Sequence, residues 1–77
     1  MTNIEMVNAV RANNITEKLI DALVEFKWNY DPYGIMEAFG GHIDDEGVRE
    51  QVIEEVKYLL ENDREILIDE LEFDAEQ

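Results

Sequence analysis

Few side chains in this sequence have the chemistry of a nucleophile or a metal ligand. The chain has no cysteine and no serine, and His42 is its only histidine. Ser–His and Cys–His pairs for nucleophilic catalysis are therefore excluded. Asp44 and Asp45 follow His42, but one histidine with two loop carboxylates is a sparse ligand set for a metal ion. We interpret His42 as a loop residue after a glycine pair and expect no metal site.

Two other patterns near His42 lack the spacing that their chemistry needs. If Gly47 took the sixth position of a calcium loop, His42 and Ile53 would take the first and twelfth, where carboxylates are required. Gly40-Gly41 does not form the GxGxxG pattern of a phosphate-binding turn. Carboxylates are numerous, but no pattern indicates the buried pocket that separates the pKa values of an acid–base pair. We expect a protein that is not an enzyme and holds no cofactor.

Negative charge is the dominant chemical feature of the chain. Its 77 residues include 20 Asp and Glu but only 6 Lys and Arg, which gives a formal net charge of −14. Hydrophobic residues still make up 45% of the chain, more than a disordered acidic tail contains. We expect one folded acidic domain over residues 1–77. Its charge opposes direct binding to nucleic acid and to anionic membranes, since both need a basic patch.

The acids are concentrated in the C-terminal half. Residues 44–77 hold 14 acidic and 3 basic residues, whereas residues 1–43 hold 6 and 3. Two sets of acids recur at every fourth position, namely Glu46, Glu50 and Glu54, then Glu61, Glu65 and Asp69. Residues at this spacing share one face of a helix and lie about 6 Å apart along its axis. That distance approximates the separation of successive phosphates along one nucleic-acid strand.

Two interpretations of these acids stay open. The first is a solvated acidic face, although solubility alone would be met by interspersed lysines. The second is a surface that imitates nucleic-acid phosphates and occupies the basic groove of a DNA-binding protein. Under the second interpretation the partner-binding residues are Asp44, Asp45, Glu46, Glu50, Glu54, Glu55, Glu61, Asp63, Glu65, Asp69, Glu70 and Glu72.

The aromatic residues mostly recur at the spacing of a helical core, Tyr58 and Phe73 included. Four of them crowd into residues 26–33, where core and hinge packing is one interpretation. The alternative is that Trp28, Tyr30 and Tyr33 anchor a dimer or another partner, because such residues dominate binding hot spots. A second copy would also stabilise so small and charged a domain, so a homodimer is one expectation.

Hydrophobic periodicity is helical almost throughout. Thr2 and Glu5 fit a capping box, and Asn13-Asn14 should end that first helix. Thr16 should cap a second helix near 17–28, and a short third helix is expected over 32–39.

The longest expected helix begins at Asp44 or Asp45, and Asn62-Asp63 breaks or bends it. The helical pattern then resumes before an acidic tail, although 65–73 also alternates weakly as a strand would. The predicted fold is all-α, a small bundle of four to five helices with a long acidic C-terminal helix.

The location of the protein can be predicted only from what the chain does not contain. It has no cysteines, no signal-peptide pattern near its start and no apolar run that could span a membrane. We expect a cytoplasmic protein, in the host-cell cytoplasm if a phage encodes it.

The order of these features resembles the small anti-restriction DNA mimics of phages, the T7-type overcome-classical-restriction family. The similar residues are Tyr30-Asp31, Ile35-Met36, Ala38, Gly41, Ile43 and Asp44, followed by an Ile-, Leu- and Glu-rich helix and an acidic C-terminus. The resemblance implies a helical dimer whose carboxylates imitate the phosphates of bent duplex DNA and block a restriction enzyme. The small acidic anti-CRISPR proteins are an equally similar class.

Two functions are therefore expected as alternatives. One is inhibition of a restriction or CRISPR-type defence protein by occupation of its basic DNA-binding surface. The other is a non-catalytic helical adaptor or oligomeric regulator that binds a protein through apolar and aromatic surface.

Overall fold

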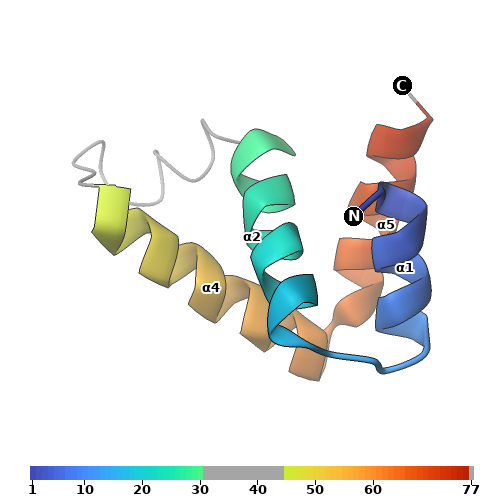
Figure 1. The fold of residues 1–77 in the computed structure, drawn as a ribbon, viewed down its shortest axis with the longest axis horizontal. Helices are drawn as coiled ribbons and strands as arrows, with labels where there is room; N and C mark the ends of the chain where they lie inside the picture. Colours follow the sequence, from blue (N-terminus) through green and yellow to red (C-terminus); the bar gives the residue numbers. More distant parts are fainter. Residues whose placement is uncertain (31–44, 77) are drawn as a thin grey trace.

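The computed structural model describes residues 1–30 and 45–76, apart from the side chains at 45, 46 and 48. Four helices occupy these residues: α1 (Asn3–Arg11), α2 (Glu17–Tyr30), α4 (Asp45–Asn62) and α5 (Arg64–Ala75). The described ranges contain no strand, so the all-α prediction is confirmed for them (Figure 1). The short helix expected over 32–39 lies outside the described residues.

The first helix begins with the predicted capping box. The backbone N–H of Glu5 donates to the Thr2 hydroxyl, and the backbone N–H of Thr2 donates to the Glu5 carboxylate, both at 3.1 Å. Each contact satisfies a donor that the first helical turn leaves unpaired. At the other end Asn13 takes a positive φ of 56°, the left-handed conformation that asparagine tolerates. The predicted stop at Asn13-Asn14 is confirmed.

Loss of this cap should loosen α1. We expect Thr2→Ala to lower the free energy of unfolding by about 1 kcal/mol. The hydrogen bond from the Thr2 backbone, with a second from its side chain, lowers the pKa of Glu5 below its ordinary 4.5. The stability that the ionised Glu5 carboxylate contributes is therefore present above pH 4.5, and it is lost as pH falls through the lowered pKa. Urea unfolding at neutral and acidic pH should show a slightly smaller loss for Thr2→Ala in acid, because alanine removes the side-chain hydrogen bond and keeps the backbone one.

The second helix also starts at its predicted cap. Leu19 donates its backbone N–H to the Thr16 hydroxyl at 3.1 Å, and the helix begins at the next residue, Glu17. It ends at Tyr30, two residues beyond the predicted end.

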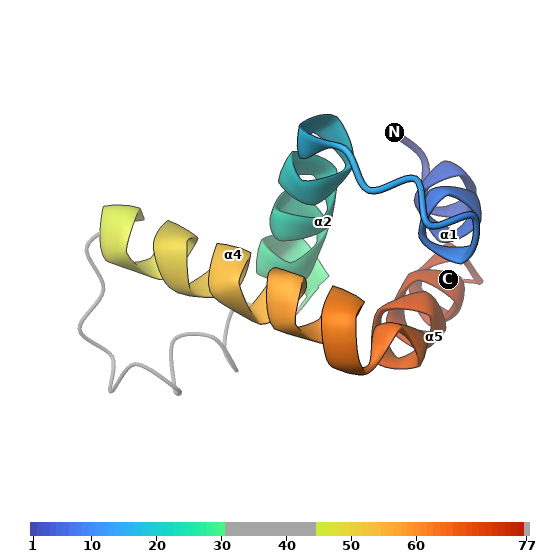
Figure 2. The same ribbon diagram turned by 90° about the horizontal axis from the view of Figure 1, so that it is seen from below.

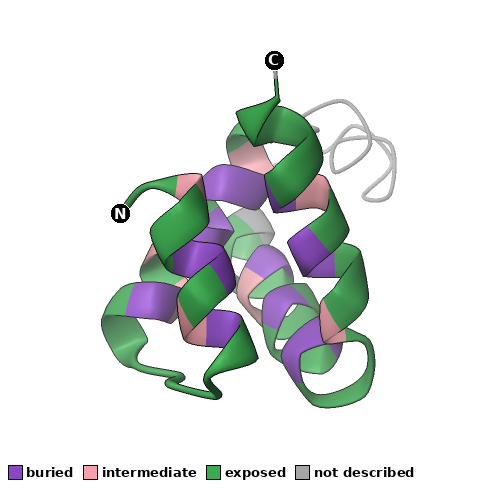
Figure 3. Cartoon of the chain, turned by 90° about the vertical axis from the view of Figure 1, so that its right-hand side faces the viewer, coloured by how far each residue is buried: buried purple, intermediate pink, exposed green. Residues whose placement is uncertain are grey.

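The helices pack in two pairs, α1 against α5 and α2 against α4 (Figures 1 and 2). In the first pair α1 and α5 are antiparallel, because Asn3 contacts Leu71 near the end of α5 while Val10 contacts Arg64 at its start. Buried positions recur along each helix between exposed ones (Figure 3). Their side chains form one core of Met6, Val7, Val10, Leu19, Leu23, Val24, Phe26, Val52, Val56, Leu59, Leu60, Leu67, Ile68 and Leu71.

The C-terminal half contains two helices, so a single long acidic C-terminal helix is not confirmed. Asp63 separates α4 from α5, with non-helical backbone angles of φ −157° and ψ 61°. The Arg64 guanidinium stabilises the break, because it donates to the backbone oxygens of Leu60 and Val10 at 3.1 and 3.2 Å. The change of direction brings the apolar face of α5 onto α1. The strand alternative over 65–73 is wrong, since these residues are helical.

This break also corrects one of the predicted acidic rows. Glu61 belongs to α4, whereas Glu65 and Asp69 belong to α5, so these three residues do not line one helix. Glu46, Glu50 and Glu54 do fall within α4.

Candidate protein-binding surface

The outer face of α4 is acidic. Val52, Val56 and Leu59 fix the inner face because they are buried in the core. Glu50 and Glu54 are exposed, and the 100° rotation per residue places them on the side away from that core. Glu61 extends this exposed side toward the end of the helix. Glu50, Glu54 and Glu61 therefore face solvent, as the phosphate-imitation interpretation requires.

The outer face of α5 repeats this arrangement. Leu67, Ile68 and Leu71 are buried against the rest of the bundle. Glu65 and Asp69 are exposed on the opposite side of the helix. Asp63, in the junction that precedes α5, is exposed as well.

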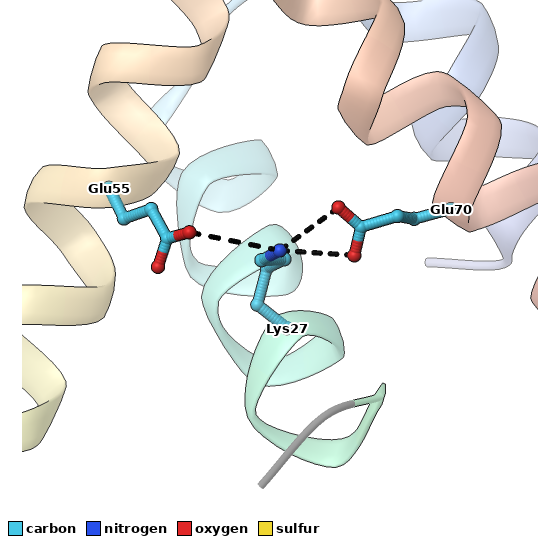
Figure 4. A network of polar contacts seen from close by, with 3 residues as sticks. All are labelled: Lys27, Glu55 and Glu70. Carbon is cyan, nitrogen blue, oxygen red and sulfur yellow. Dashed lines mark hydrogen bonds and ion pairs between the residues drawn. The ribbon is translucent and has the colours of Figure 1, made fainter. Parts of the chain in front are cut away.

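Glu70 and Glu55 are directed toward a buried lysine (Figure 4). Lys27 projects from α2 with its side chain only 10% exposed, and its Nζ donates to both carboxylate oxygens of Glu70 at 3.0 Å. Glu55 of α4 lies 4.0 Å from the same nitrogen. The Glu70 side chain is itself only 18% exposed, so this pair connects α2 to α5 instead of facing a partner.

Glu72 is also engaged within the chain, in an exposed contact between α1 and α5. The Arg11 guanidinium donates to its carboxylate at 2.8 Å. Next to it, the Asn3 amide donates to the Leu71 backbone oxygen and to the Asp74 carboxylate. These contacts close the interface between the two terminal helices.

Most of the basic residues are held by groups of the chain itself. Arg11 and Lys27 contact α5, and Arg64 donates to backbone oxygens at the junction. Arg49 lies 3.8 Å from the Asp21 carboxylate. Within the described part of the chain, Lys18 and Lys57 form no ion pair. The outer faces of α4 and α5 therefore keep a large excess of uncompensated carboxylates.

The remaining predicted binding residues are only partly covered by the structure. Asp44 lies outside the described residues, and Asp45 and Glu46 are described through their backbone alone, in α4. Tyr33 also lies outside them. Trp28 is partly buried against the core.

The last predicted anchor, Tyr30, stands at the end of α2. It is half-exposed, with its ring centroid 5.3 Å from that of Phe26.

Two exposed aromatic side chains depart from the core interpretation. Tyr58 is 62% exposed and Phe73 is 54% exposed, so for them that interpretation is wrong. The signal was present in the spacing, because each ring stands four residues after an exposed acid and out of phase with the buried leucines. Ile66, 42% exposed, adds a third apolar side chain on α5.

Small surface grooves lie among the described residues, and these residues form no metal-binding group. One groove of about 230 Å³ lies between α1 and α5, where Ile4, Val7 and Leu71 line it. Another, of about 470 Å³, lies where Ile15 and Ile20 face Lys57 and Arg64. In these same ranges no three His, Asp or Glu side chains converge as a metal site would require. None of the helices described is long and apolar enough to cross a membrane.

Comparison with protein-family models, curated proteins and solved structures finds no match to this chain.

Proposed function

We propose that this protein is an inhibitor that imitates nucleic acid and occupies the basic DNA-binding surface of another protein. The observation that supports this most is the excess of exposed carboxylates on α4 and α5, where Lys57 is the one exposed base of the described residues without an ion pair. Arg11, Lys27 and Arg64 are held by groups of the chain itself, whereas Glu50, Glu54, Glu65 and Asp69 are exposed on the outer faces of two helices.

The spacing of these acids suits a phosphate-binding surface. Glu50 and Glu54 are one helical turn apart on α4, and Glu65 and Asp69 are one turn apart on α5. One turn corresponds to about 6 Å along the axis for residues i and i+4. Lysine and arginine side chains that hold successive phosphates could then pair with successive carboxylates. Long-range attraction between surfaces of opposite charge would speed the encounter, and occupancy alone would inhibit.

The class of target comes from the resemblance to phage anti-restriction proteins. We propose a bacterial defence enzyme of the restriction or CRISPR type, met in the cytoplasm of the host cell. A homodimer of this chain would double the number of acids presented to such a target. No catalytic step belongs to this function.

The proposal predicts a partner that both salt and DNA release. Tagged protein should capture a DNA-binding protein from bacterial lysate at low ionic strength. Raising the salt from about 0.05 to about 0.3 M should weaken capture by at least about ten-fold, because the contacts are solvent-exposed ion pairs. Added DNA, as duplex or as single strands, should elute the same protein.

An unrelated acidic protein of similar size and charge is the control for this capture. A captured partner that neither DNA nor salt releases would contradict the proposal. It would instead support the second candidate, a non-catalytic adaptor that binds through apolar surface. The exposure of Tyr58, Ile66 and Phe73 favours that second candidate, and apolar contacts of this kind depend little on salt.

A further inference from the structure

The outer faces of α4 and α5 carry the same three-residue arrangement. On α4, Glu50 and Glu54 precede Tyr58, and each residue stands four positions after the one before. We call this set the α4 row. The α5 row is Glu65, Asp69 and Phe73, with identical spacing. All six side chains are exposed. Each row is therefore a line of two carboxylates and one ring along a single helix face.

The rings in these rows are available for contact. Tyr58 is 62% exposed and Phe73 is 54% exposed, although buried sites for aromatics exist in the same bundle, as Phe26 shows. Among the described residues the one contact between rings is that of Phe26 with Tyr30, so neither row ring stacks on another. One exposed aromatic side chain would need no explanation. Two rings in the same register beside paired acids indicate a surface that another molecule covers.

The combination of acids and exposed rings resembles a single-stranded nucleic acid more than a duplex. A duplex presents phosphates outside while its bases are stacked within, so an imitation of duplex DNA needs only the acids. A single strand presents phosphates and unstacked bases together. Proteins that bind single strands accordingly combine a positively charged groove with aromatic platforms on which bases stack. The α4 and α5 rows complement both features of such a groove.

We propose that each row fits the groove of a protein that binds single-stranded nucleic acid. The carboxylates of the rows pair with the Lys and Arg residues that hold phosphates, and Tyr58 and Phe73 lie on the platforms that stack bases. This inference rests on the proposed function and narrows its partner from any basic DNA-binding surface to one class. Charge complementarity supplies the attraction, and the rings supply the preference for that class.

Two displacement assays distinguish docking on a protein that binds single strands from docking on a protein that binds duplexes. In the first, this protein competes with labelled oligothymidylate on a bacterial OB-fold single-stranded-DNA-binding protein. In the second, it competes with a labelled duplex of equal phosphate number on a bacterial histone-like architectural protein, which binds the minor groove of duplex DNA. Fluorescence anisotropy at low salt gives an inhibition constant in each case. We expect the constant in the first assay to be lower by at least about ten-fold, because ring stacking contributes only there.

Substitution of the rings tests the cause of that preference. Tyr58→Ser combined with Phe73→Ser should raise the constant in the first assay by about ten-fold and leave the second unchanged. Ile4→Ser is the matched control, because Ile4 is a 68% exposed apolar side chain on α1, outside both rows. Circular dichroism should show unchanged helix content in all variants, since every substituted side chain is exposed.

Each outcome decides between the two proposals. Equal inhibition constants in the two assays, or a ring variant that behaves like the Ile4 control, would overturn the single-strand inference and leave the proposed function intact. Displacement in neither assay would also overturn the single-strand inference, whereas the proposed function is decided by the capture experiment with salt and DNA.

Discussion

Conversion of Glu50, Glu54, Glu65 and Asp69 to their amides should weaken binding to the captured partner by about 30-fold or more. Each of these carboxylates is exposed, and a single exposed ion pair contributes about 0.2–1 kcal/mol, so no single substitution should change binding much. Four pairs together amount to about 2 kcal/mol, which corresponds to the 30-fold loss. Isothermal titration of each variant with the purified partner measures this, and the salt dependence of the dissociation constant should become shallower.

A second quadruple variant distinguishes a patterned surface from bulk charge. Glu17, Asp21 and Glu25 are exposed on α2, and Glu76 is exposed at the end of α5. Conversion of these four acids to amides changes the net charge equally and keeps the four substituted acids of α4 and α5, although it removes the Asp21 partner of Arg49. Binding should then fall only a few-fold. Equal losses in the two variants would mean that overall charge attracts the partner and that the spacing of the acids has no role.

The parts of the fold that sequence alone predicts are those decided within a few residues. The Thr2 capping box, the Asn13 stop and the Thr16 cap each depend on contacts that span three or four positions. The four-residue spacing of Glu50 and Glu54 is equally local, and their exposure follows once the valines of α4 are buried. For such features, residue type and helical geometry are sufficient information.

What sequence did not predict depends on contacts between distant residues. Lys27 is 43 positions from Glu70, and nothing near it in the chain indicates that its ammonium group is buried. The sequence predicts the break at Asn62-Asp63 between α4 and α5, but not the contact between Arg64 and Val10, 54 positions apart, that stabilises it. Composition therefore groups Glu55, Glu70 and Glu72 with the partner-binding acids. In the fold, Lys27 lies beside both Glu55 and Glu70, and Arg11 binds Glu72. Only three-dimensional packing separates these acids from the free ones.

Lys27→Met should be the most destabilising of the charge substitutions in this protein. Methionine keeps most of the aliphatic length of lysine but removes the ammonium group, which leaves the largely buried Glu70 carboxylate without its partner. Loss of one member of a buried ion pair costs about 3–5 kcal/mol when both groups are fully buried. Glu70 is 18% exposed and can recover some hydration, so we expect about 2–3 kcal/mol here. In a domain of this size that lowers the melting temperature by about 10 °C or more.

Removal of both charges should reverse most of this loss. In Lys27→Met combined with Glu70→Leu, no uncompensated charge stays between α2 and α5, and both side chains become apolar. Buried pairs replaced in this way are often as stable as the original or more so, so we expect a free energy of unfolding within about 1 kcal/mol of the native chain. Urea unfolding of the native chain, the two single variants and the double variant then forms a complete double-mutant cycle.

Arg11→Met separates the effect of burial from the effect of charge. It raises the net negative charge by the same amount as Lys27→Met and also breaks an ion pair to α5. That pair is exposed, with the Arg11 and Glu72 side chains 59% and 50% accessible, so its loss should cost less than about 0.5 kcal/mol. If Lys27→Met cost no more than Arg11→Met, the Lys27–Glu70 pair would not hold α2 against α5. A large difference between the two would mean that Glu70 is needed for the fold, which leaves the exposed acids of α4 and α5 for the partner.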